Sequence, residues 1–484
     1  MNTTIPHAAT SCPPACDDAG IRFRYPDRSA CVDPRIIDRL IPADHEARLV
    51  WEWVCGLDLS GLLAGYRARH GCPGRAPIDV RLLVTLWLFA TREGVDTARE
   101  LDRLCRRDDV YRWICGGVAV NYHTLADFRV EQADWLQQQT RNAVTALHRD
   151  GLVPLQRIGL DGLRLRASAG SDSMKTADVL RAELHKADTR LQSLEAEDRA
   201  ALPRRSGRRR TKKEAACLRG ARDRCGRLRR ALEEMERTAL VREKRKKGDG
   251  ATTRLSATDP QARRMKMPDG GFRPAFNVQF GTDLDALVPI GTQTINAGND
   301  AGQAVARQEQ LEADYGIRPK TMYADGGFAT REDIQTLAAR DIVFYTPIKC
   351  EQRRKAEGQD PSQRRKGESD EVAAWRQRMS TPEGKAEYRR RGITEWTNAA
   401  ARRHGLERVS VRGLDKVGAV VLWYMLTIVL LRGFKLHAQA AAPTAAAVAA
   451  ECVVRETVTA ESAAAEPPRR EAEGPGGPQA VDGG

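Results

Sequence analysis

The sequence predicts an α/β protein in which a mixed sheet flanked by helices follows an all-helical N-terminal domain. Three observations lead to this prediction. Apolar residues recur every three or four positions over residues 34–148, which is the period of a helix. From residue 157 onward, short runs rich in Ile, Leu, Val and Phe alternate with helical patterns. Two long amphipathic helices are inserted after the first of these runs.

The N-terminal part of the chain divides into a short tail and a helical domain. Residues 1–23 are rich in Pro, Cys and small polar residues and are predicted to be disordered. In the domain of residues 24–150, "DVRLLVTLWLFATREGV" predicts a largely buried helix. The short helices and tight turns of "DTARELDRLCRRDDVYRWICGG" suit a DNA-binding module of the helix-turn-helix kind. An all-helical packing domain is the alternative, because nothing marks a recognition helix.

Residues 175–250 predict a coiled-coil hairpin inserted after the first strand. Leucines and alanines recur at spacings of three and four on both sides of "PRRSGRRR". This pattern describes two amphipathic helices joined by a Pro/Gly turn. The surface is strongly basic, as in "REKRKK", and it is open whether it contacts phosphates or is only a solvated helical face.

Strand patterns occupy most of the second domain, residues 151–437. "RIGLDGLRLRA" predicts the first strand, and "FRPAFNVQFGTD" with "ALVPIGTQTIN" predicts an antiparallel hairpin. Helices over residues 300–315 and 331–340 then alternate with the strands of "TMYADGGF" and "DIVFYTPI". Three strands followed by alternating helix and strand imply a mixed sheet with helices on its faces.

Two further segments lack a core pattern. Residues 350–381 are polar and charged and are expected to form a flexible insertion in the second domain. Residues 438–484 are rich in Ala, Pro, Gly and Glu and are predicted to be a disordered tail.

Charge and apolar runs limit the partners of the chain. Its 484 residues carry 79 Lys and Arg against 65 Asp and Glu, a formal net charge of +14. This excess favours an anionic polymer such as nucleic acid, although charge that only maintains solubility is the alternative. The most apolar run, residues 417–431, is shorter than the roughly 18 to 20 residues that span a bilayer. We expect a buried core helix there and no membrane partner.

The N-terminus and the cysteines indicate a cytoplasmic protein. The first residues lack the basic and apolar regions of a signal peptide. Eleven cysteines lie at irregular positions, without a C-x-x-C pair and without metal-ligand spacing to the eight histidines. We therefore expect reduced thiols in the cytosol.

Two aspartates lie on predicted strands. Asp161 has the same parity as Leu163 and Leu165, and a carboxylate buried among such residues is costly unless charge or hydrogen bonds compensate it. Asp325 ends a strand just before two glycines, which is a common position for a functional site in an open α/β sheet. An ordinary strand-end or turn aspartate is the alternative for each.

A third carboxylate, Glu395, lies among arginines in "YRRRGITEWTNAAARR". On one continuous helix, Tyr388, Arg391, Glu395 and Arg402 would share a face within an arc of roughly 60°. A surface array of ion pairs would give the same pattern and contribute little stability.

The three carboxylates together predict a site for hard cations. Without a set of Cys or His ligands, Asp161, Asp325 and Glu395 favour Mg²⁺, with Mn²⁺ as the alternative. Two such ions about 3.5 to 4 Å apart activate an attacking oxygen and stabilise a leaving oxygen in the displacement at a phosphodiester. These residues are therefore the candidate catalytic and metal-binding residues, and basic neighbours would hold a DNA backbone.

Several segments resemble one known family. "YRRRGITEWTNAAAR" resembles the Y-(2)-R-(3)-E-(6)-K signature of bacterial insertion-sequence transposases of the DDE type, with Arg402 in the place of the lysine. "LDGLRLRASAG" and "YADGGF" resemble the first and second catalytic blocks of that family. "GRAPIDVRLLVTLWLFATREGV" and "YHTLADFR" are similar to the InsH-like N-terminal domain that accompanies it.

The resemblance implies a ribonuclease H-like catalytic domain in which Asp161, Asp325 and Glu395 bind two Mg²⁺ ions. The implied activity is cleavage of DNA at the terminal inverted repeats, followed by strand transfer into target DNA. Tyr388, Arg391 and Arg402 would bind DNA, and the N-terminal helices would bind the repeats. The resemblance also implies a homo-oligomer in the synaptic complex and a bacterial, nucleoid-associated location. A catalytically degenerate, DNA-binding remnant is the alternative.

Overall fold

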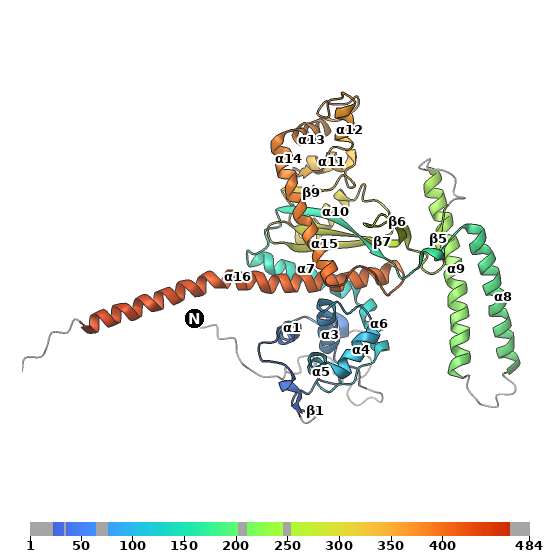
Figure 1. The fold of residues 1–484 in the computed structure, drawn as a ribbon, viewed down its shortest axis with the longest axis horizontal. Coiled ribbons are helices and arrows are strands. Elements are labelled where there is room, and N and C mark those ends of the chain that lie inside the picture. The colour runs from blue at the N-terminus through green and yellow to red at the C-terminus, as the bar shows by residue number, and fades with distance from the viewer. Residues whose placement is uncertain (1–22, 33–34, 64–75, 202–210, 245–252, 465–484) are drawn as a thin grey trace, which may run out of the picture. The chain divides into compact units, whose positions relative to one another are not determined.

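The computed structural model describes the chain except for residues 1–22, 33–34, 64–75, 202–210, 245–252 and 465–484 (Figure 1). Nearly all of the N-terminal tail predicted to be disordered, residues 1–23, lies outside the described residues. The chain divides into two compact units, Met1–Gly433 and Phe434–Gly484.

The N-terminal helices pack around one buried helix, α3 (Val80–Arg92). Every α3 side chain from Val80 to Thr91 is buried, so the prediction of a largely buried helix is confirmed. Apolar residues on all sides let α3 contact several neighbours at once. The elements of this domain are β1 (Cys31–Val32), β2 (Arg35–Ile36), η2 (Ile37–Leu40), α1 (Glu46–Cys55), α2 (Ser60–Leu63), α4 (Ala98–Arg107), α5 (Asp109–Cys115), α6 (Tyr122–Glu131) and α7 (Ala133–Arg149).

The second domain is built on a six-stranded mixed sheet (Figure 1). Its strands are β3 (Arg157–Arg166), β6 (Arg263–Lys266), β7 (Phe272–Asp283), β8 (Val288–Ile295), β9 (Thr321–Ala324) and β10 (Val343–Tyr345). The order is β10-β9-β3-β7-β6, with β8 also paired to β7. The β7–β8 pair is antiparallel, as predicted, and β3, β9 and β10 are parallel to one another. The predicted mixed α/β architecture is therefore confirmed.

Helices cover both faces of this sheet. On one face lies α10 (Ala304–Tyr315), whose Leu311 side chain would be 3.8 Å from a Cβ built on Gly281 of β7 and 3.2 Å from one built on Gly291 of β8. On the other face lie α14 (Pro382–Tyr388), the 3-10 segment η6 (Arg389–Thr394) and α15 (Glu395–Arg403).

Close packing on the second face depends on a glycine in β3. A Cβ built on Gly159 would lie 2.0 Å from Cγ2 of Thr394 and 2.7 Å from Cδ2 of Leu284. Only a residue without a side chain lets η6 approach the strand this closely. The hydroxyls of Thr282 and Thr397, 2.8 Å apart, tie α15 to β7 beside this contact.

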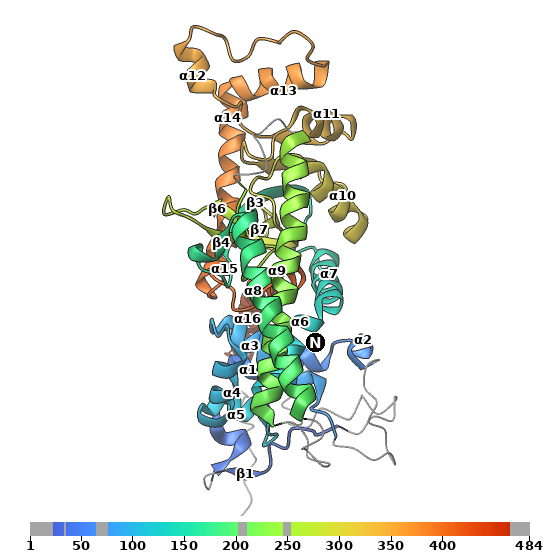
Figure 2. The ribbon, with the colours of Figure 1, turned by 90° about the vertical axis from the view of Figure 1, so that its right-hand side faces the viewer.

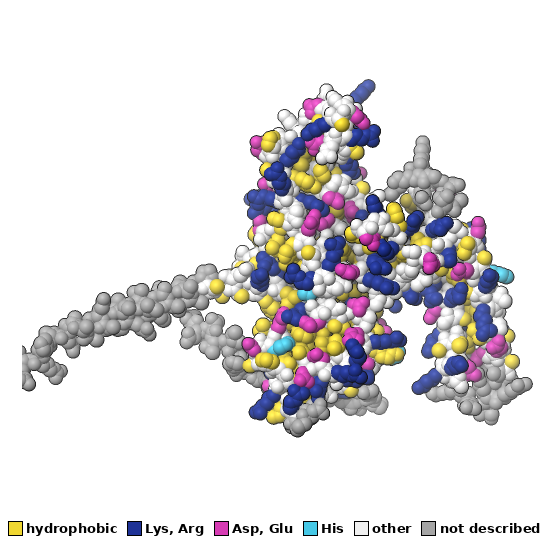
Figure 3. Space-filling model, viewed as in Figure 1, with side chains coloured by type: hydrophobic (Ala, Val, Ile, Leu, Met, Phe, Trp, Pro, Cys, Tyr) yellow, Lys and Arg dark blue, Asp and Glu magenta, His cyan; other side chains and the backbone are white. Residues whose placement is uncertain are grey.

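The helical hairpin consists of α8 (Ala177–Ala201) and α9 (Lys212–Lys244), which run side by side (Figures 1 and 2). At its base, β4 (Met174–Lys175) pairs with β5 (Leu255–Ser256). Arg222 and Arg229 of α9 form ion pairs with Glu195 and Asp188 of α8. Figure 3 shows the same mixture of basic and acidic side chains on its surface. The hairpin has its own apolar core, which includes Leu180, Ala187, Cys225, Leu228, Ala231, Met235 and Leu255.

The structure corrects the prediction that residues 350–381 form a flexible insertion. The segment contains α12 (Glu351–Ala356) and α13 (Asp370–Ser380). α13 buries Val372 and Trp375 and packs on α14 and on α11 (Arg331–Ala339). A few large apolar side chains are enough to order a segment of mostly polar composition.

The last helix, α16 (Leu414–Ala464), begins as the predicted core helix, with residues from Val417 to Leu430 buried. Among the described residues, Leu414–Ala442 has the length and hydropathy of a membrane span, but 72% of its most apolar window is buried in the protein. The helix continues to Ala464, so the prediction of disorder from residue 438 is wrong for its first part. An Ala-rich segment has high helix propensity, which the prediction from composition neglected.

Replacing Gly159 by Ala is expected to destabilise the protein by about 1–3 kcal/mol, because the new methyl group overlaps Thr394 and Leu284. Urea unfolding measures the loss. The control is Gly170→Ala, since a Cβ at Gly170 meets no atom within 4 Å. The double variant Gly159→Ala/Thr394→Ser, which removes Cγ2, should recover part of the loss; full stability of the single variant would contradict the close approach.

The hairpin is expected to be dispensable for folding of the sheet. Lys175 and Leu255 are paired across β4 and β5, so an Asn-Gly turn can replace residues 176–254 without moving either strand. We expect the shortened protein to keep a cooperative unfolding transition in circular dichroism. Loss of that transition would mean that the hairpin core also stabilises the sheet.

Candidate active site

The register of two parallel strands brings Asp161 and Asp325 together. β3 and β9 pair with Leu160 opposite Ala324, so the next position on each strand is an aspartate. Adjacent strands lie about 4.8 Å apart, and residues in register point to the same face. The two carboxylates therefore begin from neighbouring backbone positions on the face covered by α14, η6 and α15.

The turn after β9 holds the Asp325 carboxylate. Its Oδ1 accepts the N–H of Gly327 at 2.7 Å, which closes a tight turn. The hydroxyl of Thr346 donates to the carbonyl oxygen of Asp325 at 3.0 Å and joins this turn to the end of β10. Asp325 is half-buried at the edge of the sheet.

The helix that was predicted to carry Glu395 is interrupted. Tyr388 ends α14, Arg391 lies in the 3-10 segment η6, and Glu395 begins α15. A 3-10 segment has three residues per turn, so the predicted single α-helical face is wrong. Arg391 and Glu395 still meet, with 3.2 Å between Nη1 and Oε1. Arg402 is exposed, and its side chain makes no hydrogen bond or ion pair with the described residues.

Asp161 is the electrostatic centre of the site. Its side chain is buried, with 7% of the residue exposed, and its Oδ1 accepts from Nη2 of Arg391 at 3.1 Å. Burial raises the pKa of Asp161, and the charges of Asp325 and Glu395 add to this rise. Arg391 and the N–H of Gly162 act in the opposite direction. The protein therefore compensates the buried charge only in part.

Arg391 links two of the three acids, Asp161 and Glu395. One guanidinium nitrogen contacts Asp161 and the other contacts Glu395, which is 67% exposed. Burial alone would lower the pKa of Arg391, but the acids around it raise that pKa overall, with Asp161 the largest contributor. Burial raises the pKa of Tyr388, and the same acids contribute to its shift. Four predicted residues thus share one electrostatic environment with Asp161, and Arg402 is outside it.

Asn398 belongs to the site although the sequence did not single it out. Its Nδ2 donates to Oδ2 of Asp161 at 2.8 Å, while its Oδ1 is buried without a partner. The signal was a polar residue at helical spacing from Glu395, directly before the three alanines of α15. In sequence alone this asparagine is an ordinary polar helix residue.

The three carboxylates have the ligand chemistry that a hard cation prefers, but they do not lie close enough together to form a complete metal site. Carboxylate oxygens are the preferred ligands of Mg²⁺, and the buried carboxylate lacks full compensation. Among the described residues, however, no group of three or more His, Cys, Asp or Glu is close enough to hold a metal ion. Arg391 and Asn398 donate to both oxygens of Asp161 instead.

Replacing Asn398 by Ala is expected to destabilise the protein by about 1–3 kcal/mol, because Oδ2 of Asp161 loses its donor in a buried position. Chemical denaturation measures the change. The exposed Asn299→Ala is the control and should be neutral. Equal stability of both variants would show that the amide of Asn398 does not support Asp161.

Comparison with known protein families relates this geometry to a function. A model described as "Transposase DDE domain" matches residues 249–431, and one described as "Transposase domain (DUF772)" matches residues 35–131. The first match includes Asp325 and Glu395, whereas Asp161 precedes it, on the other side of the helical hairpin. No curated protein and no solved structure gives a significant match. With both domains in one polypeptide, the chain belongs to the insertion-sequence transposases of the DDE type.

Proposed function

We propose that this transposase cuts DNA at the terminal inverted repeats of its insertion sequence and joins the cut ends to target DNA. The observation that carries the proposal is the register of β3 and β9, which makes Asp161 and Asp325 neighbours, with Arg391 linking Asp161 to Glu395. Transposase domains indicate transposition and a DNA substrate in general terms. The specific chemistry is our inference.

Asp161, Asp325 and Glu395 would hold two Mg²⁺ ions, with Mn²⁺ as a substitute. When bound, such ions activate an attacking hydroxyl or water and stabilise the leaving oxygen at a phosphodiester. Transposases of the DDE type generally use divalent metal ions, and the incompletely compensated charge of Asp161 supports a cation here. Arg391 would then exchange one carboxylate contact for a phosphate.

The basic and aromatic residues beside the acids would position DNA. Arg391 presents a guanidinium that matches a phosphate with two parallel hydrogen bonds. Arg402, which is exposed on α15, can reach a phosphate farther from the acids. The Tyr388 hydroxyl keeps its proton at neutral pH, like any tyrosine whose pKa is not lowered, and burial raises its pKa further; it can therefore donate to a phosphate oxygen.

The strand arrangement supports a ribonuclease H-like relation for the catalytic domain. β8, β7 and β3 are antiparallel neighbours, and β9 and β10 follow in parallel to β3. We further propose that the N-terminal helices bind the terminal repeats, and that protomers assemble into a homo-oligomer on paired DNA ends. The proposed location is the bacterial cytoplasm, in association with the nucleoid.

Removing any one acid tests the proposal. Asp161→Ala, Asp325→Ala and Glu395→Ala should each abolish Mg²⁺-dependent cleavage of DNA carrying the element's inverted repeats, while gel-shift assays show retained binding. The control is Glu383→Ala, since Glu383 is exposed at the start of α14 and makes no ion pair. Normal cleavage by all three variants would refute the assignment. Repeat binding by the unmodified protein without cleavage under any divalent ion would favour the degenerate remnant.

A further inference from the structure

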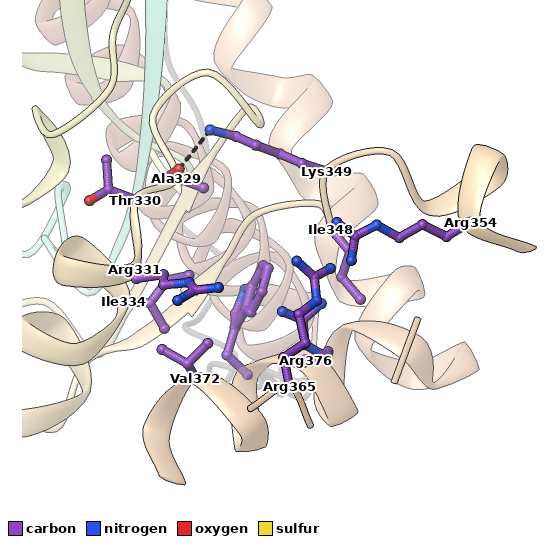
Figure 4. A pocket seen from close by; sticks show the side chains of 11 residues that line it. Ala329, Thr330, Arg331, Ile334, Ile348, Lys349, Arg354, Arg365, Val372 and Arg376 are labelled. Carbon is purple, nitrogen blue, oxygen red and sulfur yellow. Dashed lines mark hydrogen bonds between the residues drawn. The ribbon is translucent and has the colours of Figure 1, made fainter. Parts of the chain in front are cut away.

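A hollow of about 130 Å³ lies between the N-terminal end of α11, the turn after β10, and α13 (Figure 4). Apolar side chains line one part of it, among them Ile334, Ile348 and Val372. The rest is cationic. The basic residues that line the hollow are Arg331, Lys349, Arg354, Arg365 and Arg376.

The nearby acid, Glu368, neutralises only part of this charge, because one carboxylate is shared by three arginines. Its carboxylate is fully buried and forms two hydrogen bonds with Arg376, which is itself buried. Arg331 and Arg365 approach the same carboxylate only to 3.6 and 3.9 Å, beyond hydrogen-bond distance. Arg354 has no hydrogen-bond or ion-pair partner among the described side chains. Three guanidinium groups therefore remain without a full counter-charge.

The polar side chains of the hollow are mostly donors. The indole N–H of Trp375 is buried without a partner in a residue that is only 6% exposed, and an indole can only donate. Nζ of Lys349 donates to the carbonyl oxygen of Ala329 at 2.8 Å and keeps two further N–H groups (Figure 4). Donors with surplus positive charge complement a compact anion that has several acceptor oxygens. Guanidinium groups match phosphate in this way.

The residues that line the hollow directly follow the turn that carries Asp325. Ala329 lies four residues after Asp325, and Thr346, which donates to the Asp325 carbonyl oxygen, lies two residues before Ile348. A Cβ on Gly326 would lie 3.3 Å from Pro347, so the two turns are in contact. DNA held at the carboxylates would therefore run close to the hollow.

We propose that this hollow binds a backbone phosphate of the DNA substrate, apart from the phosphate that is cut. The proposal rests on the proposed function for its choice of DNA. The shared chemistry is a phosphate group, which either DNA or free phosphate can supply. The apolar wall beside the cations suits the sugar that adjoins a backbone phosphate.

Neighbouring arginines of α12 provide a matched test. Arg354 lines the hollow, whereas Arg353 is 78% exposed and pairs with Glu357 outside it. We expect Arg354→Ala to weaken binding of a duplex of arbitrary sequence by about tenfold and to reduce the slope of log K against log salt by about 0.9. Arg353→Ala removes the same charge and should change neither quantity appreciably. Circular dichroism verifies that both variants are folded.

The experiment distinguishes DNA from free phosphate as the source of the bound phosphate. It also distinguishes a failure of this phosphate site from a failure of the proposed DNA cleavage. Calorimetry with inorganic phosphate, without DNA, reports on the hollow alone. Phosphate binding lost in Arg354→Ala with unchanged DNA binding would overturn the DNA assignment, and identical behaviour of Arg353→Ala and Arg354→Ala in both assays would overturn the site. Both assays omit divalent ions, so a failure of the cleavage chemistry would leave them readable.

Discussion

The fold has to accommodate the carboxylate of Asp161 inside a sheet, and the surrounding elements are arranged around that requirement. An isolated buried charge costs several kcal/mol, so donors must reach it. Arg391 and Asn398 supply them from η6 and α15. Yet Asp161 and Glu395 share one guanidinium, and the pKa of Asp161 remains raised because burial outweighs its partners. Such a deficit of positive charge favours the binding of a cation at this carboxylate.

Arg391 and Asn398 reach Asp161 because η6 and α15 lie directly on strand β3. Gly159, two residues before Asp161, admits Thr394, and Thr394 immediately precedes Glu395. The close contact between the Gly159 backbone and the Thr394 side chain thus holds the third acid and Arg391 beside the strand.

The sequence predicted the parts of the site that depend on the regular alternation of side chains along a strand. Strand side chains alternate with a period of two, so the parity of Asp161 and the strand-end position of Asp325 could be inferred from neighbouring residues alone. The prediction of one helical face around Glu395 was wrong because residues 389–394 form a 3-10 segment that packs against Gly159, a long-range contact that local periodicity does not record. Asn398 was missed for the same reason, since only the folded chain brings it to Asp161. The insertion of residues 350–381 was judged from its polar composition, but Trp375, Val372 and the buried Glu368–Arg376 pair order it through contacts that composition does not record.

The distribution of charge explains why an acidic site can attract a polyanion. Duplex DNA carries one negative charge per about 1.7 Å of its axis, and three carboxylates at the sheet edge would repel it. Attraction must come from cations placed beside the acids but not neutralised by them. Arg391 meets only part of this need, because it already contacts Asp161 and Glu395. The cations around the hollow after Asp325 lie on or beside α11, α12 and α13 and keep a surplus of positive charge, since Arg331, Arg365 and Arg376 share the single carboxylate of Glu368. Separation of the two charge signs on adjoining turns would therefore allow the proposed DNA binding and the proposed acid-dependent chemistry to coexist at one edge of the sheet.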